Sequence, residues 1–301
     1  MAEWLSWLTE PLSYGFIVRG LIAGVLASVA GAMLSAFVVW RGMAFAGDAI
    51  AHSILPGIVV AYLLGFSLFV GAVGAAIVAV IGIGLISRKG ALREDTAIGV
   101  MFAGLFALGI LLLSRIASYQ DLNHILFGNI LGVSRSDLGM MTVVVVLVLG
   151  VVALFYKELL VTSFDPAHSE AIGLSPELMR YGLLGAIALT TVVGAQTVGV
   201  VLIVALLVTP AAAASLVSRR LGRIMALSVV FSVVATGAGF YASYYLDFAS
   251  GPSIVLALTT IFVISWVVSR VGRFGSRRGA RHHGAAGSTP GTPPQMTSPA
   301  E

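Results

Sequence analysis

The sequence contains no cysteine, which excludes disulfides, thiolate metal sites and thiol nucleophiles. Charge is also scarce, because only 10% of the 301 residues are charged, against about 25% in soluble domains. Instead, 58% of the residues are hydrophobic, and 35 glycines favour close helix packing in lipid. The chain is therefore predicted to be an all-α, polytopic transmembrane helical bundle, in which any metal site uses oxygen and nitrogen ligands.

Lysine is nearly absent, and its two positions exclude one large class of ATP-hydrolysing proteins. A nucleotide-binding P-loop needs Gly-Lys followed by Ser or Thr, but Lys89 and Lys157 both follow other residues. Any ATP-driven work must then come from a separate subunit. A membrane-embedded metalloprotease is also poorly supported, since no His-Glu-x-x-His run occurs. We predict that the chain is not an enzyme.

Nine apolar runs approach the length of about 20 residues that a bilayer-spanning helix needs. They lie near 16–39, 44–64, 66–86, 97–114, 138–156, 180–197, 199–217, 224–246 and 254–270. The sixth and seventh runs are so close that one broken or re-entrant element, and hence eight spans, is the alternative. With nine spans, all but three of the 17 basic residues fall on one side, the exceptions being Arg19, Arg115 and Arg135. That side is predicted to be cytoplasmic, in a cell (inner or plasma) membrane, with the N-terminus outside and the C-terminus inside.

The composition changes near residue 272, which divides the chain into a transmembrane domain over 1–271 and a tail over 272–301. The tail is rich in Arg, Gly, Ser and Pro and is expected to be a disordered cytoplasmic segment. Five basic residues lie between Arg270 and Arg281, so the net charge of +4 is local and does not indicate a nucleic-acid partner. The role of this tail stays open.

An acid and a histidine, Asp48 and His52, lie within the second apolar run. Residues four apart share one face of a helix, and a carboxylate beside an imidazole is a ligand pair for a divalent cation. Ionisable groups inside a bilayer are costly and usually functional. The alternative is a buried polar pair, or a helix end that reaches the headgroups. Pro56 and Gly57 follow one turn later, where they can free backbone carbonyls beside a pathway.

The longest predicted cytoplasmic connection contains a short helix in the loop 159–179. Asp165 can cap its N-terminus, Pro166 suits its first position and Gly173 can end it. Ordered loops of this kind are usually functional.

Three further polar residues, His124, Asp247 and Gln196, are candidates either to line the pathway or to have a structural role. His124 lies in an external stretch and is expected in a solvated loop, with metal entry as the alternative. Asp247 is expected to be a turn residue between the last two spans. Gln196 either lines a pathway or provides a hydrogen bond between helices.

Several blocks, in order and over about residues 15 to 270, resemble the permeases of zinc/manganese/iron ABC importers. The blocks are FVVWRGMAFAGDAIAH at 37–52, LFGNIL at 126–131, DPAHSEAIG at 165–173, VVLIVALLVTPAA at 200–212 and GPSIVL at 251–256. The resemblance implies the ABC importer permease architecture, a homodimer, two cytoplasmic ATPase subunits and an extracellular or periplasmic metal-binding protein. It makes Asp48 and His52 contacts of the transported ion. It also implies a coupling helix that meets the ATPase through Asp165, Pro166, Glu170, Ala171 and Gly173.

The predicted function is therefore that of a membrane permease subunit in an ATP-driven importer of Zn, Mn or Fe. The ion would arrive from the binding protein and pass by alternating access, as cargo, with no permanently bound cofactor. The alternatives are a permease for siderophores or cobalamin, and a secondary metal transporter driven by an ion gradient. Imidazole with carboxylate suits all three metals, so the sequence does not select among them.

Overall fold

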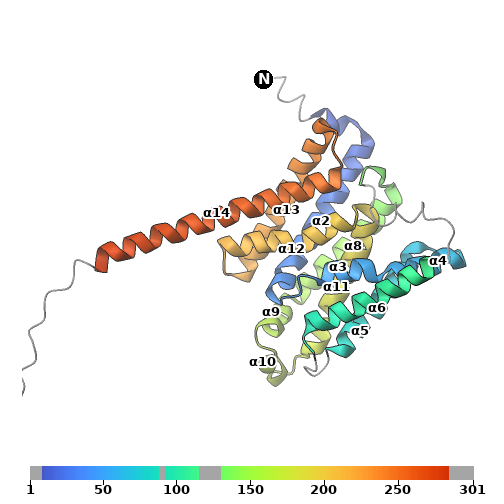
Figure 1. The fold of residues 1–301 in the computed structure, drawn as a ribbon, viewed down its shortest axis with the longest axis horizontal. Helices are drawn as coiled ribbons and strands as arrows, with labels where there is room; N and C mark the ends of the chain where they lie inside the picture. Colours follow the sequence, from blue (N-terminus) through green and yellow to red (C-terminus); the bar gives the residue numbers. More distant parts are fainter. Residues whose placement is uncertain (1–8, 88–91, 115–129, 285–301) are drawn as a thin grey trace, which may run out of the picture.

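The computed structural model describes residues 9–87, 92–114 and 130–284, with side chains as far as Val271. Every regular element in these ranges is a helix (Figure 1). The α-helices are α2 (Gly15–Trp40), α3 (Ala46–Ser53), α4 (Leu55–Leu64), α5 (Leu68–Ile86), α6 (Glu94–Leu113), α8 (Arg135–Leu154), α9 (Tyr156–Phe164), α10 (Pro166–Ala171), α11 (Pro176–Thr197), α12 (Val200–Val217), α13 (Leu221–Leu246) and α14 (Ser250–Gly284). Two short 3-10 turns, Pro11–Ser13 and Ile130–Gly132, precede α2 and α8.

Nine helices in the described part of the chain are long and apolar enough to cross a bilayer, which confirms the predicted spans. One span combines α3 and α4, which are separated at Ile54. Pro56 explains this break, because proline has no N–H to donate and its ring collides with the carbonyl four residues earlier. The sixth and seventh spans are two helices, α11 and α12, which separate at Gly199 with a positive φ of 97°.

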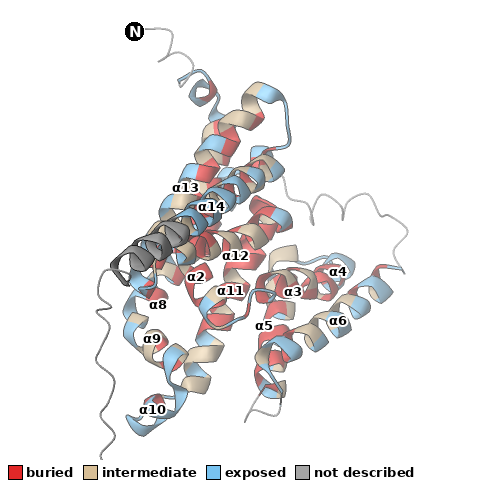
Figure 2. Cartoon of the chain, turned by 60° about the vertical axis from the view of Figure 1, so that its left-hand side comes forward, coloured by how far each residue is buried: buried red, intermediate tan, exposed pale blue. Residues whose placement is uncertain are grey.

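The helices form two groups that α11 connects. Helices α2, α12, α13 and α14 pack on one another, and α3, α4, α5 and α6 form the second group (Figure 1). Helix α11 contacts α5 and α3 on one side and α12 and α2 on the other, while α8 packs on α2 and α11. The buried residues concentrate where the groups meet, and the outer faces of α6 and α14 are largely exposed (Figure 2). In a membrane, those apolar outer faces meet lipid.

Helices α4 and α5 cross at a point where only glycine fits. A Cβ added to Gly57 would collide with the backbone carbonyl of Gly71, and a Cβ added to Gly71 would collide with the carbonyl of Gly57. The backbones of the two helices therefore lie closer together at this crossing than they could if either position carried a side chain. It fixes α4 against α5 and so anchors the span that begins with Asp48 and His52.

Polar contacts between described residues mark the two ends of the bundle. At one end, Arg41 after α2 donates to Ser163 in α9, and Arg180 donates to the end of α5. At the opposite end, Arg19 near the start of α2 donates to the carbonyl of Val133, before α8. We call the first of these the α10 end.

One predicted boundary differs from the observed one. The fifth span stops at Leu154, and after a break at Phe155 the chain continues as α9, so part of the predicted cytoplasmic loop is helical. Helix α14 continues to Gly284, and the part of it that is apolar enough to span a membrane is Ser250–Val271. Residues 285–301 lie outside the described part.

Candidate functional site

The short helix α3 presents Asp48 in its first turn and His52 in its last turn. One helical turn separates them, so both side chains lie on the same face. The Asp48 Oδ1 atom is 3.5 Å from the His52 Nε2 atom. The Asp48 and His52 side chains are 34% and 33% exposed, whereas Ala49, Ile50 and Ala51 between them are buried. The pair therefore faces away from the packed core of this chain.

The spacing of the two atoms suits a shared metal ion. Zinc binds histidine nitrogen and carboxylate oxygen at about 2.0–2.2 Å, and two such ligands in a tetrahedron are about 3.4 Å apart. The observed separation of 3.5 Å meets this requirement without rearrangement. Two ligands do not close a site. No group of three or more His, Cys, Asp or Glu side chains able to hold a metal occurs within residues 9–87, 92–114 and 130–271.

Two aromatic rings of α6 pack against the imidazole, and a ring from the loop before α3 packs against one of them. The ring centroid of His52 is 5.3 Å from that of Phe106 and 6.0 Å from that of Phe102. Phe102 and Phe106 are themselves stacked, with centroids 5.6 Å apart and planes 12° from parallel. Phe45 meets Phe102 edge to face at 5.6 Å. The wall of the site facing α6 is therefore apolar.

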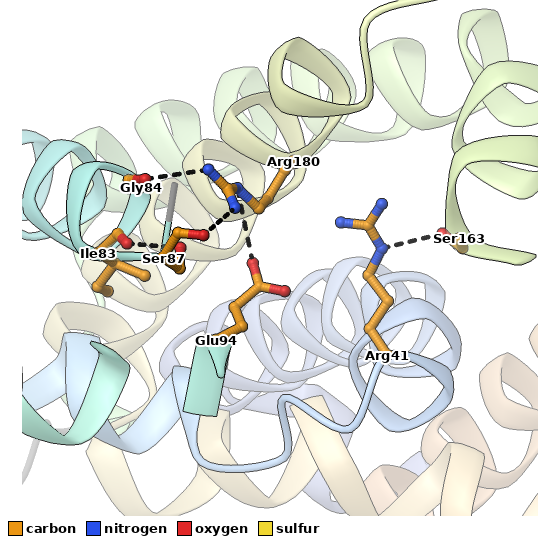
Figure 3. Close-up of polar contacts among 7 residues, drawn as sticks. All are labelled: Arg41, Ile83, Gly84, Ser87, Glu94, Ser163 and Arg180. Carbon is orange, nitrogen blue, oxygen red and sulfur yellow. Dashed lines mark hydrogen bonds and ion pairs between the residues drawn. The ribbon is translucent and has the colours of Figure 1, made fainter. Parts of the chain in front are cut away.

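A polar cluster lies at the α10 end (Figure 3). Arg180 on α11 donates to the carbonyl of Gly84 at 3.0 Å and to that of Ser87 at 3.4 Å. Its Nε atom is 4.0 Å from Glu94 Oε1, an ion pair too long to be a hydrogen bond. Glu94 opens α6, and its carboxylate lies between Arg180 and Arg41 (Figure 3). The cluster thus ties α11 to the end of α5 and the start of α6.

Arg41 connects this cluster to the segment that carries α10. Its Nε atom donates to Ser163 Oγ at 3.0 Å, which links the end of α2 to α9. Burial lowers the pKa of the Arg41 guanidinium, Glu94 acts in the opposite direction and Arg180 lowers it further. Arginine stays protonated despite such a shift. A cleft of about 660 Å³ separates α9 and α10 from the starts of α6 and α11, with Arg41, Glu94 and Arg180 among its lining residues.

Helix α10 has the caps that the sequence predicts. The Asp165 side chain accepts from the backbone N–H of His168 at 2.9 Å, and Pro166 occupies the first turn. The chain leaves the helix through Gly173, whose φ is 84°. Glu170 and Ala171 are exposed, so one face of α10 is uncovered in the chain.

Two of the other predicted polar residues, Asp247 and Gln196, lie in the described part of the chain. Asp247 ends α13 in a left-handed conformation with φ 54°, as expected of a turn residue. Gln196 is half-buried within α11, and its neighbour Thr197 donates to the carbonyl of Val193 at 2.8 Å. His124 and the block at 126–129 lie outside the described residues.

The sequence alone did not identify the residues that contact His52, nor the pairing of Glu94 with Arg180. Phe102 and Phe106 are four residues apart on α6, a spacing that signals a shared face but not which helix it meets. Glu94 and Arg180 are charged residues near the ends of two apolar runs, which marks them as unusual. Their sequence separation hides the fact that they pair.

Known proteins resemble the chain over most of its length. Residues 13–269 match the model of the family described as "ABC 3 transport family". The manganese transport system membrane protein MntC of Listeria innocua is 43% identical over 263 residues, covering 87% of this chain and 94% of that protein. The chelated iron transport system membrane protein YfeD of Yersinia pestis is 38% identical over 266 residues, covering 88% and 90%.

A solved structure agrees with the observed fold. PsaBC from Streptococcus pneumoniae, solved in complex with a Fab, matches with a TM-score of 0.76 and 35% identity, covering 87% of this chain and 95% of the matched chain. The helical architecture is therefore that of an ABC transporter permease. Together with the family match over residues 13–269, this shows that the chain belongs to the ABC 3 transport family.

Proposed function

We propose that this chain is the permease subunit of an importer that carries a divalent transition metal ion across the cell membrane. The observation that carries the proposal is the Asp48–His52 pair, 3.5 Å apart on an uncovered face of a membrane-spanning element. Relatives named for manganese and iron transport support a first-row divalent ion as the cargo. Zinc belongs to the same ligand class. The cargo is transported and leaves unchanged, so the chain itself performs no covalent chemistry.

A second copy of the chain completes the proposed site. Each chain supplies one carboxylate and one imidazole, and the two half-exposed side chains would otherwise face lipid. A two-fold axis beside α3 would bring two carboxylates and two imidazoles together, enough for a four-coordinate ion. Because α3 lies in the second helix group with α6 on its flank, the dimer contact is proposed along that group (Figure 1).

Energy is proposed to come from cytoplasmic ATPase subunits that bind α10. The chain has no P-loop lysine. Asp165 and Pro166 stabilise α10, while the exposed Glu170 and Ala171 are available to a partner. Gly173 turns the chain back towards α11. Movement of α10 would be transmitted through Ser163 and Arg41 to α2.

The proposed cycle begins when an extracellular or periplasmic binding protein delivers the ion. Asp48 and His52 replace part of its hydration shell, and ATP use in the partner changes which end of the pathway is open. The N-terminus is proposed to be outside and the C-terminus inside. In that topology α3, which begins five residues after Arg41, lies in the cytoplasmic half of the pathway.

Uptake of Mn(II), Fe(II) and Zn(II) by cells that express the complete importer tests the proposal. We expect Asp48→Ala with His52→Ala to abolish uptake at unchanged permease abundance, and competition among the three metals to rank the cargo. Asp95→Asn, on the exposed first turn of α6, is the matched control and should transport normally. Undiminished uptake by the double variant would contradict the proposed role of Asp48 and His52. Uptake that persists with an ATPase-dead partner would favour the gradient-driven alternative.

A further inference from the structure

The imidazole of His52 makes most of its contacts in the described part of the chain with aromatic rings. Metal-binding histidines almost always donate their second ring N–H to a carboxylate, a carbonyl or a water, which fixes the ring and its tautomer. Among the residues that the structure describes, no side chain or carbonyl accepts a hydrogen bond from His52. Its polar contact in that set is the 3.5 Å approach to Asp48, its proposed fellow ligand. The printed contacts of the ring on its other faces are aromatic.

Two phenylalanines of α6 pack against the ring. Phe106 and Phe102 lie 5.3 Å and 6.0 Å from His52, centroid to centroid, with planes inclined at 67° and 60°. Both distances fall within the range at which aromatic rings attract one another. The inclined contacts restrict rotation of the imidazole about its side-chain torsions while leaving its Nε2 edge towards Asp48.

The phenylalanine pair is itself held in place. Phe102 and Phe106 stack on each other almost in parallel, and Phe45 closes the outer side of Phe102 at 88°. Helix α6 also packs against α3 and α4. One turn further along α6, Gly109 meets the side chain of Leu55 at the start of α4, which fixes the register between the two spans.

We propose that Phe102 and Phe106 are positioning residues, which orient His52 for the passing ion by ring packing. This inference rests on the proposed function of His52. It also has a consequence for transport. A hydrogen-bond acceptor on the second nitrogen makes an imidazole more basic and its metal bond stronger. An apolar support orients the ligand without that added strength, which suits a site that must release its ion.

The test uses the permease with its ATPase partner in nanodiscs, with Mn(II) as the probe. Pulsed electron paramagnetic resonance detects the ¹⁴N coupling of an imidazole bound to Mn(II). Wild type should show this coupling, and His52→Ala should abolish it. Phe102→Leu and Phe106→Leu should each weaken the ¹⁴N signal at equal Mn(II) occupancy and reduce Mn(II) affinity about tenfold. Phe106→Tyr keeps the ring and should keep both.

Uptake kinetics supply a second readout. The leucine variants should raise the KM for Mn(II) while the maximal rate per transporter changes by less than about twofold, as expected when ground-state binding is lost. Phe231→Leu on α13, a helix that packs on α2, α12 and α14, is the matched control. Phe102→Met and Phe106→Met replace the leucine variants if those do not reach the membrane, since methionine fills the space without a flat ring.

The outcomes separate the two proposals. Leucine and methionine variants with wild-type affinity and wild-type ¹⁴N coupling would overturn the positioning role and leave the metal site intact. A wild-type permease that binds Mn(II) without His52-dependent coupling would overturn the proposed function of His52, and the positioning role with it. Loss of signal in Phe231→Leu as well would show a general packing effect and would also contradict the inference.

Discussion

Arg180 is the residue on which the polar cluster at the α10 end depends. Its guanidinium is 15% exposed, bonds two carbonyls at the end of α5 and approaches Glu94. Both carbonyls lie at the end of α5, and the last turn of a helix leaves its C=O groups without intrahelical partners. One side chain thus satisfies the end of α5 and balances the charge at the start of α6 (Figure 3).

Arg180→Gln should therefore lower the free energy of unfolding by about 1–3 kcal/mol, since it removes charged hydrogen bonds and leaves Glu94 without its ion pair. The midpoint of denaturant unfolding of the purified permease measures the change. Adding Glu94→Gln should recover part of the loss, because the uncompensated carboxylate is then neutral. Arg223→Gln on the exposed start of α13 is the control, expected to change little. Equal stability of Arg180→Gln and Arg223→Gln would show that the cluster contributes nothing.

Contacts within one helix could be predicted from the sequence, whereas contacts between helices could not. Asp48 and His52 are neighbours along one helix, so their meeting follows from helical geometry alone. Arg180 meets Gly84 and Ser87 across more than 90 positions, and His52 meets Phe106 across 54. These contacts depend on which helices pack together and in which register. Apolar periodicity is weak in lipid, because a membrane helix is apolar on both its packed and its lipid-facing sides.

The crossing of α4 and α5 is the contact between elements that tolerates least change. Gly71→Ala places a methyl group against the Gly57 carbonyl and the Ala61 side chain. We expect a loss of about 1–3 kcal/mol in unfolding free energy from the overpacking. Gly74→Ala on the same helix meets nothing within 4 Å and should be neutral or stabilising, since alanine favours helix more than glycine. The midpoints of thermal unfolding of the two variants, measured in the same detergent, test this expectation. Equal midpoints would contradict the close crossing of α4 and α5.

Helix α10 is short enough that its cap decides whether it forms. Asp165→Ala removes the acceptor for the His168 N–H and should cost α10 about 1 kcal/mol, with a corresponding fall in ATP-driven metal uptake. Asp165→Asn keeps an acceptor and should transport nearly normally. Uptake and ATPase activity of the assembled importer measure the effect. If the alanine and asparagine variants lose uptake equally, the carboxylate charge is what matters and the capping explanation is wrong.

The elements themselves were predictable because the length of an apolar run sets the length of a span. All nine runs became helices. The helix breaks were harder to locate. Pro56 marked the break between α3 and α4, whereas the break at Phe155 has no proline or glycine nearby that would signal it. The break between α11 and α12 was located more closely, because the predicted runs end at 197 and begin at 199, and Gly199 with its positive φ lies at that point.

At the scale of the whole molecule, the two helix groups have different roles in the proposal. The group of α3 to α6 carries the proposed ion contacts and their aromatic support, while α2 connects through Arg41 and Ser163 to the α10 segment. Helix α11 touches both groups and places Arg180 at the α10 end. One polar connection therefore joins α9, which precedes α10, to the end of α2, and another joins α11, which follows α10, to the end of α5.

The absence of cysteine makes the orientation of the whole chain directly measurable. Single cysteines can be placed at Phe66 and Phe248, both exposed in loops at one end, and at Ser218 in the loop at the other end. We expect Phe66→Cys and Phe248→Cys to react with a membrane-impermeant maleimide in intact cells, and Ser218→Cys only after permeabilisation, because most basic residues lie on the Ser218 side. The reverse pattern would overturn the N-out assignment. Labelling of both Phe66→Cys and Ser218→Cys from outside would mean that α11 and α12 together cross the membrane once, since two full crossings must return the chain to the side on which α11 begins.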